Sequence, residues 1–457
     1  MGTTIAAIST AMSASGIGIV RMSGPEAMDI ISRIYRSKNG KKKIKEVKSH
    51  TIHYGYIYNG DEIVDEVLVM VMKAPGTYTG EDTVEIDCHG GVYAMKRVLE
   101  TVLQNGARIA EPGEFTKRAF LSGRLDLSQA EAVMDVIQAK SSAALKSSVE
   151  QLKGSVLRAV KEIRSVLIYH IAYIESALDD PEHISLEGYP EELDKVVEEE
   201  YKKTEKLLKS ADDGRMIQEG IKTVILGKPN AGKSSLLNFL VGEDRAIVTD
   251  IAGTTRDTLE EYISLHGISL RIIDTAGIRE TEDVVEKIGV GKAKKMAEGA
   301  DLLLYVVDSS TPLDENDGEI MELLSGRKSI VIYNKTDLEA VADISELKEK
   351  TGSPVIPVSV VEETGIEELE HTIRDMFFQG EISFDNEVYI TNARHKAALE
   401  EALESLNMVK NSIHAGMSED FFSIDLMNAY ESLGKIIGES VGEDLVNEIF
   451  SRFCVGK

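Results

Sequence analysis

The sequence predicts a multidomain chain of α/β and α-helical parts, in which an α/β domain interrupts a helical domain and a small α+β domain comes first. Three observations predict this. Between residues 219 and 383, apolar runs typical of buried parallel strands alternate with helical patterns. On either side, residues 121–218 and 384–457 show the three-and-four spacing of apolar residues that amphipathic helices require. Residues 1–120 carry short β-rich runs separated by Gly and Pro turns.

The two helical segments can be halves of one domain, because the ends of a compact domain often lie close together and tolerate an insertion between them. Two separate helical domains are the alternative. Within residues 219–383, the expected strands are TVIL, LRIID, LLLYVVD, IVIYN and PVIPVS, which suit a parallel sheet that is buried on both faces.

Composition limits the partners and the compartment. With 51 basic and 78 acidic residues, the formal charge of −27 repels polyanions over most of the surface. Residues 33–48 are a basic exception, either a phosphate-contacting patch or a solvated loop. Cys88 and Cys454 lie far apart without a CxxC partner, which disfavours disulfides and zinc. Because no apolar run could span a bilayer and no signal peptide is visible, we expect a cytoplasmic protein without a membrane partner.

A phosphate-binding loop is predicted at GKPNAGKS, residues 227–234, between the strand-like TVIL and the helical pattern SLLNFLV. Its glycines allow backbone N–H groups to wrap phosphates, Lys233 places a cation on them, and Ser234 offers a hydroxyl group to Mg²⁺. This motif alone does not distinguish an ATPase from a GTPase.

The nucleobase is read by NKTD, residues 334–337, after the strand IVIYN. Guanine presents two adjacent donors, N1–H and the exocyclic amine, and the carboxylate of Asp337 can accept both, whereas adenine has an acceptor and a C–H there. The presence of Asp337 therefore predicts that the site binds GTP rather than ATP. Ser359 stands where GTPases place a loop that closes over the base, and the usual small residue after it is Val360 here.

Two further motifs match the switch segments of a GTPase. GTTRD, residues 253–257, places Thr255 to bind Mg²⁺ when the γ-phosphate is present, and DTAG, residues 274–277, supplies a carboxylate for Mg²⁺ and a glycine N–H for the γ-phosphate. The order of the motifs predicts a P-loop GTPase. Its nucleotide-contacting residues are Asn230, Ala231, Gly232, Lys233, Ser234, Ser235, Thr249, Asp250, Ile251, Ala252, Gly253, Thr254, Thr255, Asp274, Thr275, Ala276, Gly277, Asn334, Lys335, Thr336, Asp337 and Ser359.

Hydrolysis needs a group that orients the attacking water. Many small GTPases use a glutamine directly after DTAG, but Ile278 stands there and cannot hold water by a hydrogen bond. Glu286 is the candidate replacement, and a solvated helix charge is the alternative. No arginine finger is evident in the sequence. A monovalent cation beside the side-chain oxygen of Asn230 could supply that charge, unless Asn230 only shapes the loop.

The motifs GIGIVRMSG, PGEFTKRAFLSGRLDLSQAEAV, GKPNAGKSSLLN, GTTRD, DTAGIRE, NKTD and FCVGK resemble those of the MnmE (TrmE) family of tRNA modification GTPases over essentially the whole chain. The resemblance implies a folate-binding, dimer-forming first domain (1–120), a helical domain in two parts (121–218 and 384–457) and an inserted GTPase domain (219–383). It also implies a homodimer that works with a flavoprotein, MnmG, as a heterotetramer, with FAD on the partner only.

The resemblance further implies the chemistry. Such proteins install an aminomethyl-type group, of the carboxymethylaminomethyl class, on carbon 5 of the tRNA wobble uridine. The one-carbon unit comes from 5,10-methylenetetrahydrofolate, of which 5-formyltetrahydrofolate is an analogue. Hydrolysis of GTP is activated by potassium.

Site residues carried over from the family fall into four sets. Potassium would be held by Asn230, Thr249, Ile251 and Thr254; Mg²⁺ by Ser234 and Thr255; folate by Arg21, Glu85, Arg124 and Lys457; and the catalytic set would be Glu286, Lys233, Thr255 and Cys454. Arg124 replaces the lysine that relatives often carry, and CVGK replaces the usual CIGK. The resemblance assigns Cys454 a role in modification, whereas a merely buried small residue is the alternative.

Two alternatives of different class stay open. A ribosome-assembly GTPase also tolerates a hydrophobic residue after DTAG, but such proteins usually append a basic RNA-binding domain, and the flanking regions here are helical or acidic. A folate-binding protein whose GTPase is only regulatory is the other.

Overall fold

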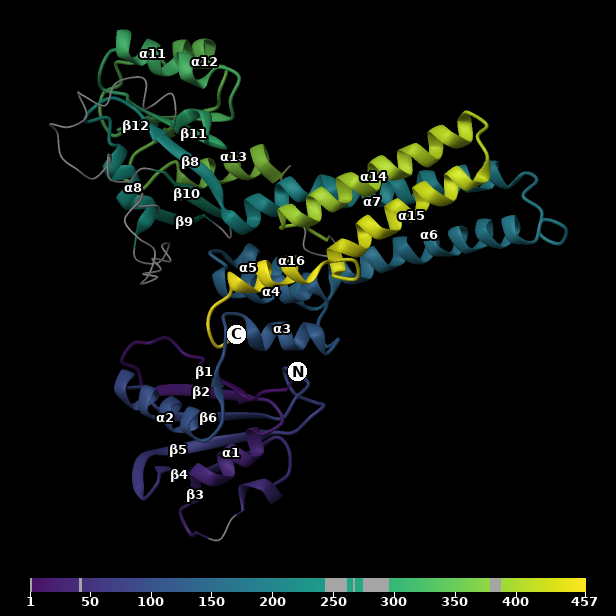
Figure 1. Cartoon of the computed structure of the whole chain (residues 1–457). Helices are drawn as coiled ribbons and strands as arrows, with labels where there is room; N and C mark the ends of the chain where they lie inside the picture. Colours follow the sequence, from purple (N-terminus) through teal and green to yellow (C-terminus); the bar gives the residue numbers. More distant parts are fainter. Residues whose placement is uncertain (1, 41–42, 243–260, 266–267, 274–295, 379–387) are drawn as a thin grey trace. The chain divides into compact units, whose positions relative to one another are not determined.

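The computed structural model describes residues 2–40, 43–242, 261–265, 268–273, 296–378 and 388–457. The chain, drawn in Figure 1, divides into two compact units. The first, here the terminal unit, contains Met1–Met134, Leu152–Val166 and Tyr430–Lys457, and the second, the central unit, contains Asp135–Gln151 and Leu167–Ala429. Both ends of the chain therefore belong to the terminal unit.

The terminal unit contains a seven-stranded sheet with the strand order β3-β4-β5-β6-β2-β1-β7. The strands are β1 (Ile5–Ile8), β2 (Ile17–Ser23), β3 (Tyr35–Ser37), β4 (Thr51–Asn59), β5 (Glu62–Met72), β6 (Thr83–His89) and β7 (Arg108–Ile109), all antiparallel to their neighbours except the parallel pair β1 and β7. One apolar cluster joins the sheet to α1 (Ala27–Ile34) and α2 (Val92–Gln104). The α+β prediction for this region is confirmed.

Helices from both ends of the sequence pack together in the same unit. The C-terminal helix α16 (Glu443–Ser451) contributes Val446 and Phe450 to an apolar cluster with Leu127 and Ala130 of α4 (Leu127–Gln138). Nearby, the Arg164 side chain of α6 (Ser155–Asp179) donates 3.1 Å to the carbonyl oxygen of Tyr430 in α15 (Glu419–Ile437). These contacts fit a helical domain whose two parts flank an insertion.

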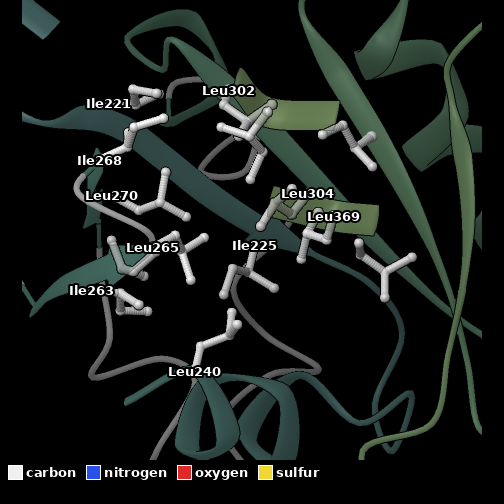
Figure 2. Packing of buried hydrophobic residues seen from close by; sticks show 14 of the residues in the cluster. Ile221, Ile225, Leu240, Ile263, Leu265, Ile268, Leu270, Leu302, Leu304 and Leu369 are labelled. Atoms are coloured by element: carbon white, nitrogen blue, oxygen red, sulfur yellow. The ribbon is translucent and has the colours of Figure 1, made fainter. Parts of the chain in front are cut away.

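The central unit contains a six-stranded sheet in the order β13-β12-β11-β8-β10-β9. Its strands are β8 (Ile221–Leu226), β9 (Glu261–Leu265), β10 (Ile268–Ile272), β11 (Leu302–Asp308), β12 (Ser329–Asn334) and β13 (Val355–Val358), parallel except for the pair β9 and β10. Alternate residues of β11 join two apolar clusters, with Leu304 in one and Tyr305 in the other, so this strand is buried on both sides. Figure 2 shows the first cluster.

The helices of the central unit are α5 (Ser142–Leu152), α7 (Tyr189–Glu219), α8 (Lys233–Val241), α11 (Glu315–Leu324), α12 (Ile344–Thr351), α13 (Ile366–Phe378) and α14 (Ala393–His414), with α6 and α15 extending into it. Position 214 inside α7 requires glycine, because a Cβ atom there would lie 2.2 Å from the carbonyl oxygen of Ile390. Of the helices that the structure describes, none has the length and apolar composition needed to cross a membrane.

Candidate functional site

The phosphate loop follows β8 and leads into α8, which is the strand, loop and helix context that the sequence predicts. Gly227, Asn230 and Gly232 have φ values of 149°, 63° and 97°. A Cβ atom on Gly232 would lie 2.2 Å from the side-chain nitrogen of Asn334, so only glycine fits there. α8 begins at Lys233, and the backbone N–H groups at the start of a helix point along its axis, where an anion can accept from them.

Lys233 folds back over this loop. Its Nζ atom donates to the carbonyl oxygens of Gly227, at 2.8 Å, and Lys228, at 2.6 Å. Burial lowers the pKa of Lys233, because desolvation disfavours the ammonium form. A phosphate group bound here would be an anionic partner for the ammonium group and would oppose this lowering of the pKa.

The NKTD turn is tied to the phosphate loop by two side chains. Asn334, which is buried, donates from Nδ2 to the carbonyl oxygen of Ala231 at 2.9 Å, and Lys335 donates from Nζ to that of Asn230 at 2.9 Å. Lys335 also forms an ion pair with Asp308 at the end of β11. These hydrogen bonds therefore fix the positions of the NKTD turn and the phosphate loop relative to each other.

The Asp337 carboxylate is exposed and held by a buried hydroxyl group. Ser359, which is fully buried, donates from Oγ to Oδ1 of Asp337 at 2.7 Å. Ser359 is itself fixed by backbone hydrogen bonds to and from Thr364 of 3.3 and 3.0 Å. The side chain of Val360 packs against the apolar cluster of Figure 2, which accommodates the departure from a small residue. One carboxylate oxygen is thus oriented before any ligand arrives.

A second cluster of charged groups lies in the terminal unit. Arg21 of β2 stands directly opposite Glu85 of β6 in the sheet, and its Nε atom donates to Oε1 of Glu85 at 2.6 Å. The guanidinium carbon lies 5.9 Å from the ring centroid of Tyr78 and 5.7 Å from that of Phe115. That of Arg124 lies 4.8 Å from the Tyr78 ring.

The end of the chain reaches this cluster. Arg21 donates from Nη1 to the carbonyl oxygen of Gly456 at 3.2 Å, and the backbone N–H of Phe115 donates to that of Lys457 at 3.2 Å. Gly456 has a φ of 93°, and a Cβ atom there would lie 2.6 Å from the carbonyl oxygen of Ile8. Burial and the neighbouring Arg21 lower the pKa of the Lys457 amine, and Glu85 opposes them. Three cations therefore gather around one carboxylate and two aromatic rings.

Comparison with known proteins identifies the family. The family model of the MnmE helical domain matches residues 127–454, and that of the GTP-binding protein TrmE N-terminus matches residues 4–124. The tRNA modification GTPase MnmE of Lachnoclostridium phytofermentans is 59% identical, over 99% of each chain. The chain belongs to the MnmE family of tRNA modification GTPases.

Other relatives agree with this assignment. MnmE of Geobacillus kaustophilus is 49% identical and that of Thermoanaerobacter pseudethanolicus 50% identical, each over 99% of both chains. Among solved structures, Era in complex with MgGDPNP and a segment of 16S ribosomal RNA is 29% identical over 40% of this chain and 66% of that chain, with a TM-score of 0.28. As an MnmE-family member, this chain is a GTP-binding enzyme that hydrolyses GTP in tRNA modification, which favours that prediction over ribosome assembly.

The structure brings together some predicted site residues of this MnmE-family chain. Of the nucleotide set, it describes Asn230 to Ser235, Asn334 to Asp337 and Ser359, with Ser234 and Ser235 exposed at the start of α8. All four predicted folate residues lie in the terminal unit. Outside the described residues lie Thr249, Asp250, Ile251, Ala252, Gly253, Thr254, Thr255, Asp274, Thr275, Ala276, Gly277 and Glu286, whose roles stay predictions.

Sequence reasoning missed Tyr78 and Phe115. Nothing in their local pattern distinguishes a ring that faces a cation from a core aromatic residue, although Phe115 lies in the PGEFTKRAF motif on which the resemblance depends. The sequence also left open that Cys454 is merely a buried small residue. That alternative is wrong, because Cys454 is exposed. Cys88 is the buried cysteine, and burial raises the pKa of its thiol to about 11.

The basic segment at residues 33–48 makes local contacts. Lys45 forms an ion pair with Asp29 and Lys43 with Glu46, while Lys38 lies 5.5 Å from the ring centroid of Tyr54. For Lys38, Lys43 and Lys45 these contacts favour a solvated segment, while Lys41 and Lys42 lie outside the described residues.

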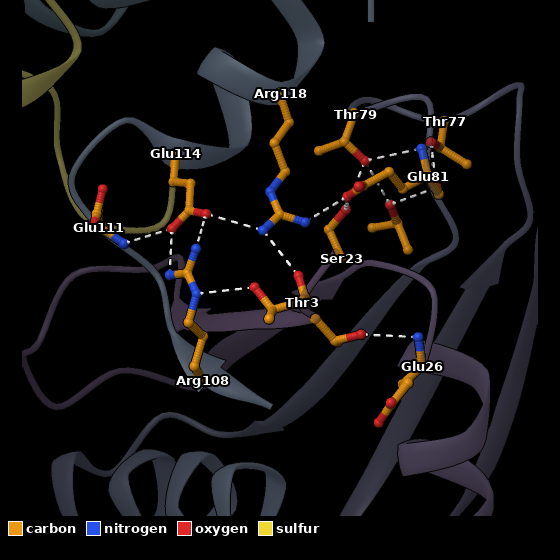
Figure 3. Close-up of polar contacts among 12 residues, drawn as sticks. Thr3, Ser23, Glu26, Thr77, Thr79, Glu81, Arg108, Glu111, Glu114 and Arg118 are labelled. Carbon is orange, nitrogen blue, oxygen red and sulfur yellow. Dashed lines mark hydrogen bonds and ion pairs between the residues drawn. The ribbon is translucent and has the colours of Figure 1, made fainter. Parts of the chain in front are cut away.

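A buried ion network supports the sheet of the terminal unit (Figure 3). Arg118 of α3 (Glu114–Leu121) donates to Glu81 at 2.8 Å, to Glu114 at 2.9 Å and to the carbonyl oxygen of Thr3 at 2.9 Å. Arg108 forms a second ion pair with Glu114. Because Phe115 follows Glu114 directly, the network fixes the start of the helix that carries this ring.

Proposed function

We propose that this chain is a potassium-activated GTPase that works as a homodimer with the flavoprotein MnmG, in a heterotetramer whose FAD belongs to the partner. Together they add a carboxymethylaminomethyl-type group to carbon 5 of the tRNA wobble uridine, with 5,10-methylenetetrahydrofolate as the one-carbon donor. The observation that carries the proposal is the cluster of Arg21, Glu85 and Lys457 beside two aromatic rings.

The chemistry of that cluster fits a folate. A pterin ring carries a ring N–H and an exocyclic amine side by side, and the carboxylate of Glu85 can accept both, as Asp337 does from guanine. Tyr78 and Phe115 offer aromatic surface, and Arg21, Arg124 and Lys457 offer cations for the carboxylates of the folate tail. When bound, the folate supplies the one-carbon unit, while these side chains bind and orient it.

For the nucleotide, Ser234 and Thr255 would hold Mg²⁺, and Asn230, Thr249, Ile251 and Thr254 would hold potassium. The exposed, left-handed position of Asn230 supports its part, because the loop directs its backbone around the phosphates and leaves the amide group at the surface. Glu286 would orient the attacking water in place of glutamine.

Hydrolysis of GTP is expected to be faster in potassium than in sodium, because a cation beside the phosphates replaces the missing arginine finger, which can be worth about 10³-fold or more in rate. Steady-state phosphate release in matched chloride salts measures this. Asn230→Gly is the informative variant, since glycine keeps the left-handed φ and removes only the amide. Equal rates in both salts for the wild-type chain would show that no monovalent cation takes part in hydrolysis.

5-Formyltetrahydrofolate is expected to bind the wild-type chain and to lose most of its affinity in Arg21→Ala, because a charged hydrogen bond is worth about 1.5–3 kcal/mol, or roughly 10- to 100-fold. Isothermal titration calorimetry measures this. Arg97→Ala is the matched control, since Arg97 pairs with Glu62 in the same unit, away from this cluster. Undiminished binding in Arg21→Ala would show that the proposed pocket is wrong.

The proposed reaction is tested by deleting the gene and measuring the wobble uridines of the cell's tRNAs by mass spectrometry. We expect the carbon-5 modification to disappear, to return with the wild-type gene and to stay absent with Arg21→Ala. Wobble uridines in the deletion strain that are identical to those of the parent would leave the ribosome-assembly interpretation ahead.

A further inference from the structure

The phosphate loop carries a second lysine that the nucleotide motif does not assign. Lys228 follows the first glycine of GKPNAGKS, and its side chain is only 19% exposed. Its Nζ atom lies 2.7 Å from Oδ2 of Asp317 and 3.0 Å from Oδ2 of Asp314. Lys228 therefore directs its charge toward α11 and two carboxylates.

Asp317 is a rigid anchor for this lysine. It is 1% exposed, and its carboxylate has donors on both oxygens: the hydroxyl of Tyr305 donates to Oδ1 at 2.6 Å, and the backbone N–H of Asp314 donates to Oδ2 at 2.8 Å. Tyr305 is itself fully buried in β11. Asp314 and Asp317 also form the capping box of α11. Asp317 therefore connects the phosphate loop, through Lys228, to β11 and α11.

Lys233 contacts the backbone of Lys228. The carbonyl oxygen of Lys228 accepts from the N–H of Ala231 at 3.3 Å and from Nζ of Lys233 at 2.6 Å. A side chain that fixes residue 228 therefore fixes one of the two carbonyl groups that orient the phosphate-binding ammonium. A second set of hydrogen bonds, from Asn334 and Lys335 to the carbonyl oxygens of Ala231 and Asn230, joins the loop to the NKTD turn and does not involve Lys228.

We propose that Lys228 and Asp317 are positioning residues for the phosphate end of the nucleotide: their buried ion pair holds the loop in the shape that directs Lys233 at the β- and γ-phosphates. This role goes beyond the proposed modification chemistry and depends only on the GTPase activity. The ion pair acts on phosphate affinity through residue 228, whereas base selection depends on the Asp337 carboxylate of the NKTD turn.

The test compares GDP with GMP, because GMP lacks the β-phosphate that Lys233 reaches. In the full-length chain with Mg²⁺, we expect Lys228→Met to weaken GDP binding about tenfold and to leave GMP affinity within about twofold, as displacement of a fluorescent guanine nucleotide measures. Lys228→Arg keeps the cation and is expected to restore most of the GDP affinity. Lys350→Met, in an exposed pair with Glu346, is the matched control and should bind both nucleotides like the wild type.

A double variant separates positioning from an uncompensated charge. Lys228→Met leaves the Asp317 carboxylate buried without its cation, and Asp317→Asn in the same chain removes that charge. If the ion pair positions the loop, GDP affinity stays low in Lys228→Met/Asp317→Asn even when its circular dichroism melting curve returns to that of the wild type. Wild-type GDP affinity in Lys228→Met or in the double variant, or an equal loss for GDP and GMP, would overturn the proposal.

Discussion

Asp337→Asn is expected to weaken binding of GDP by about 10²- to 10⁴-fold, the largest effect of any single substitution in the nucleotide site. The carboxylate accepts from both N1–H and the exocyclic amine of guanine, and each charged hydrogen bond is worth about 1.5–3 kcal/mol. An asparagine keeps one acceptor but turns an N–H group toward a guanine donor. Calorimetric titration of the Mg²⁺-loaded full-length chain measures the loss.

The same substitution is expected to create a preference for a different nucleobase. Xanthine carries a carbonyl oxygen where guanine carries the exocyclic amine, so a side-chain amide in place of the carboxylate, with one donor and one acceptor, matches xanthosine diphosphate. Asp337→Asn should therefore prefer xanthosine to guanosine diphosphate. Asp343→Asn, an exposed helix cap that asparagine also satisfies, is the matched control. Unchanged GDP affinity in Asp337→Asn would rule out this carboxylate as the base reader.

Arg118→Met is expected to destabilise the terminal unit by about 3–5 kcal/mol, because it removes the buried cation that pairs with Glu81 and one of the two arginines that pair with Glu114. Arg118 is 5% exposed and bonds to both Glu81 and Glu114 (Figure 3). Hydrogen exchange of the β2 and β6 amides, followed by mass spectrometry of the full chain, measures the local free energy of unfolding. We expect exchange to accelerate about 10²-fold or more.

A matched control removes the same charge at the surface. Arg97→Met breaks exposed pairs with Glu62 and Glu100 and should change exchange in β2 and β6 little. If Arg118→Met exchanged no faster than Arg97→Met, the network would not support the sheet.

Acid acts on the same network. Burial alone would raise the pKa of Glu114, but the hydrogen bonds from Arg108, the N–H of Glu111 and Arg118 lower it below its usual range. A folded-state pKa below the unfolded value of about 4.3 means that the stabilisation is present above that pH and is lost as the pH falls through the folded-state pKa.

How far the sequence predicts the fold depends on whether the signal is local. β8, β11 and β12 are predicted because parallel strands covered on both faces read as continuous apolar runs. The sequence does not predict β9, EYISL, because an antiparallel edge strand is only partly buried and gives a short, weak pattern. Its pairing with β10 is what completes the sheet.

The site residues, too, can be predicted from the sequence only where the signal is local. The phosphate loop and the NKTD turn follow from spacing, because each is one continuous segment with its own chemistry. Neither the approach of Lys457 to Arg21 nor the pairing of Lys228 with Asp317 could be read from spacing, since each joins residues that are distant in the sequence. Only the tertiary fold brings such groups close together.

The Asp337 carboxylate, oriented by Ser359, is expected to select guanine at this phosphate loop. Isothermal titration of the wild-type, Mg²⁺-loaded chain with GDP and with ADP tests it most directly. We expect GDP to bind at least about 10²-fold more tightly than ADP. Equal affinities for the two nucleotides would contradict it.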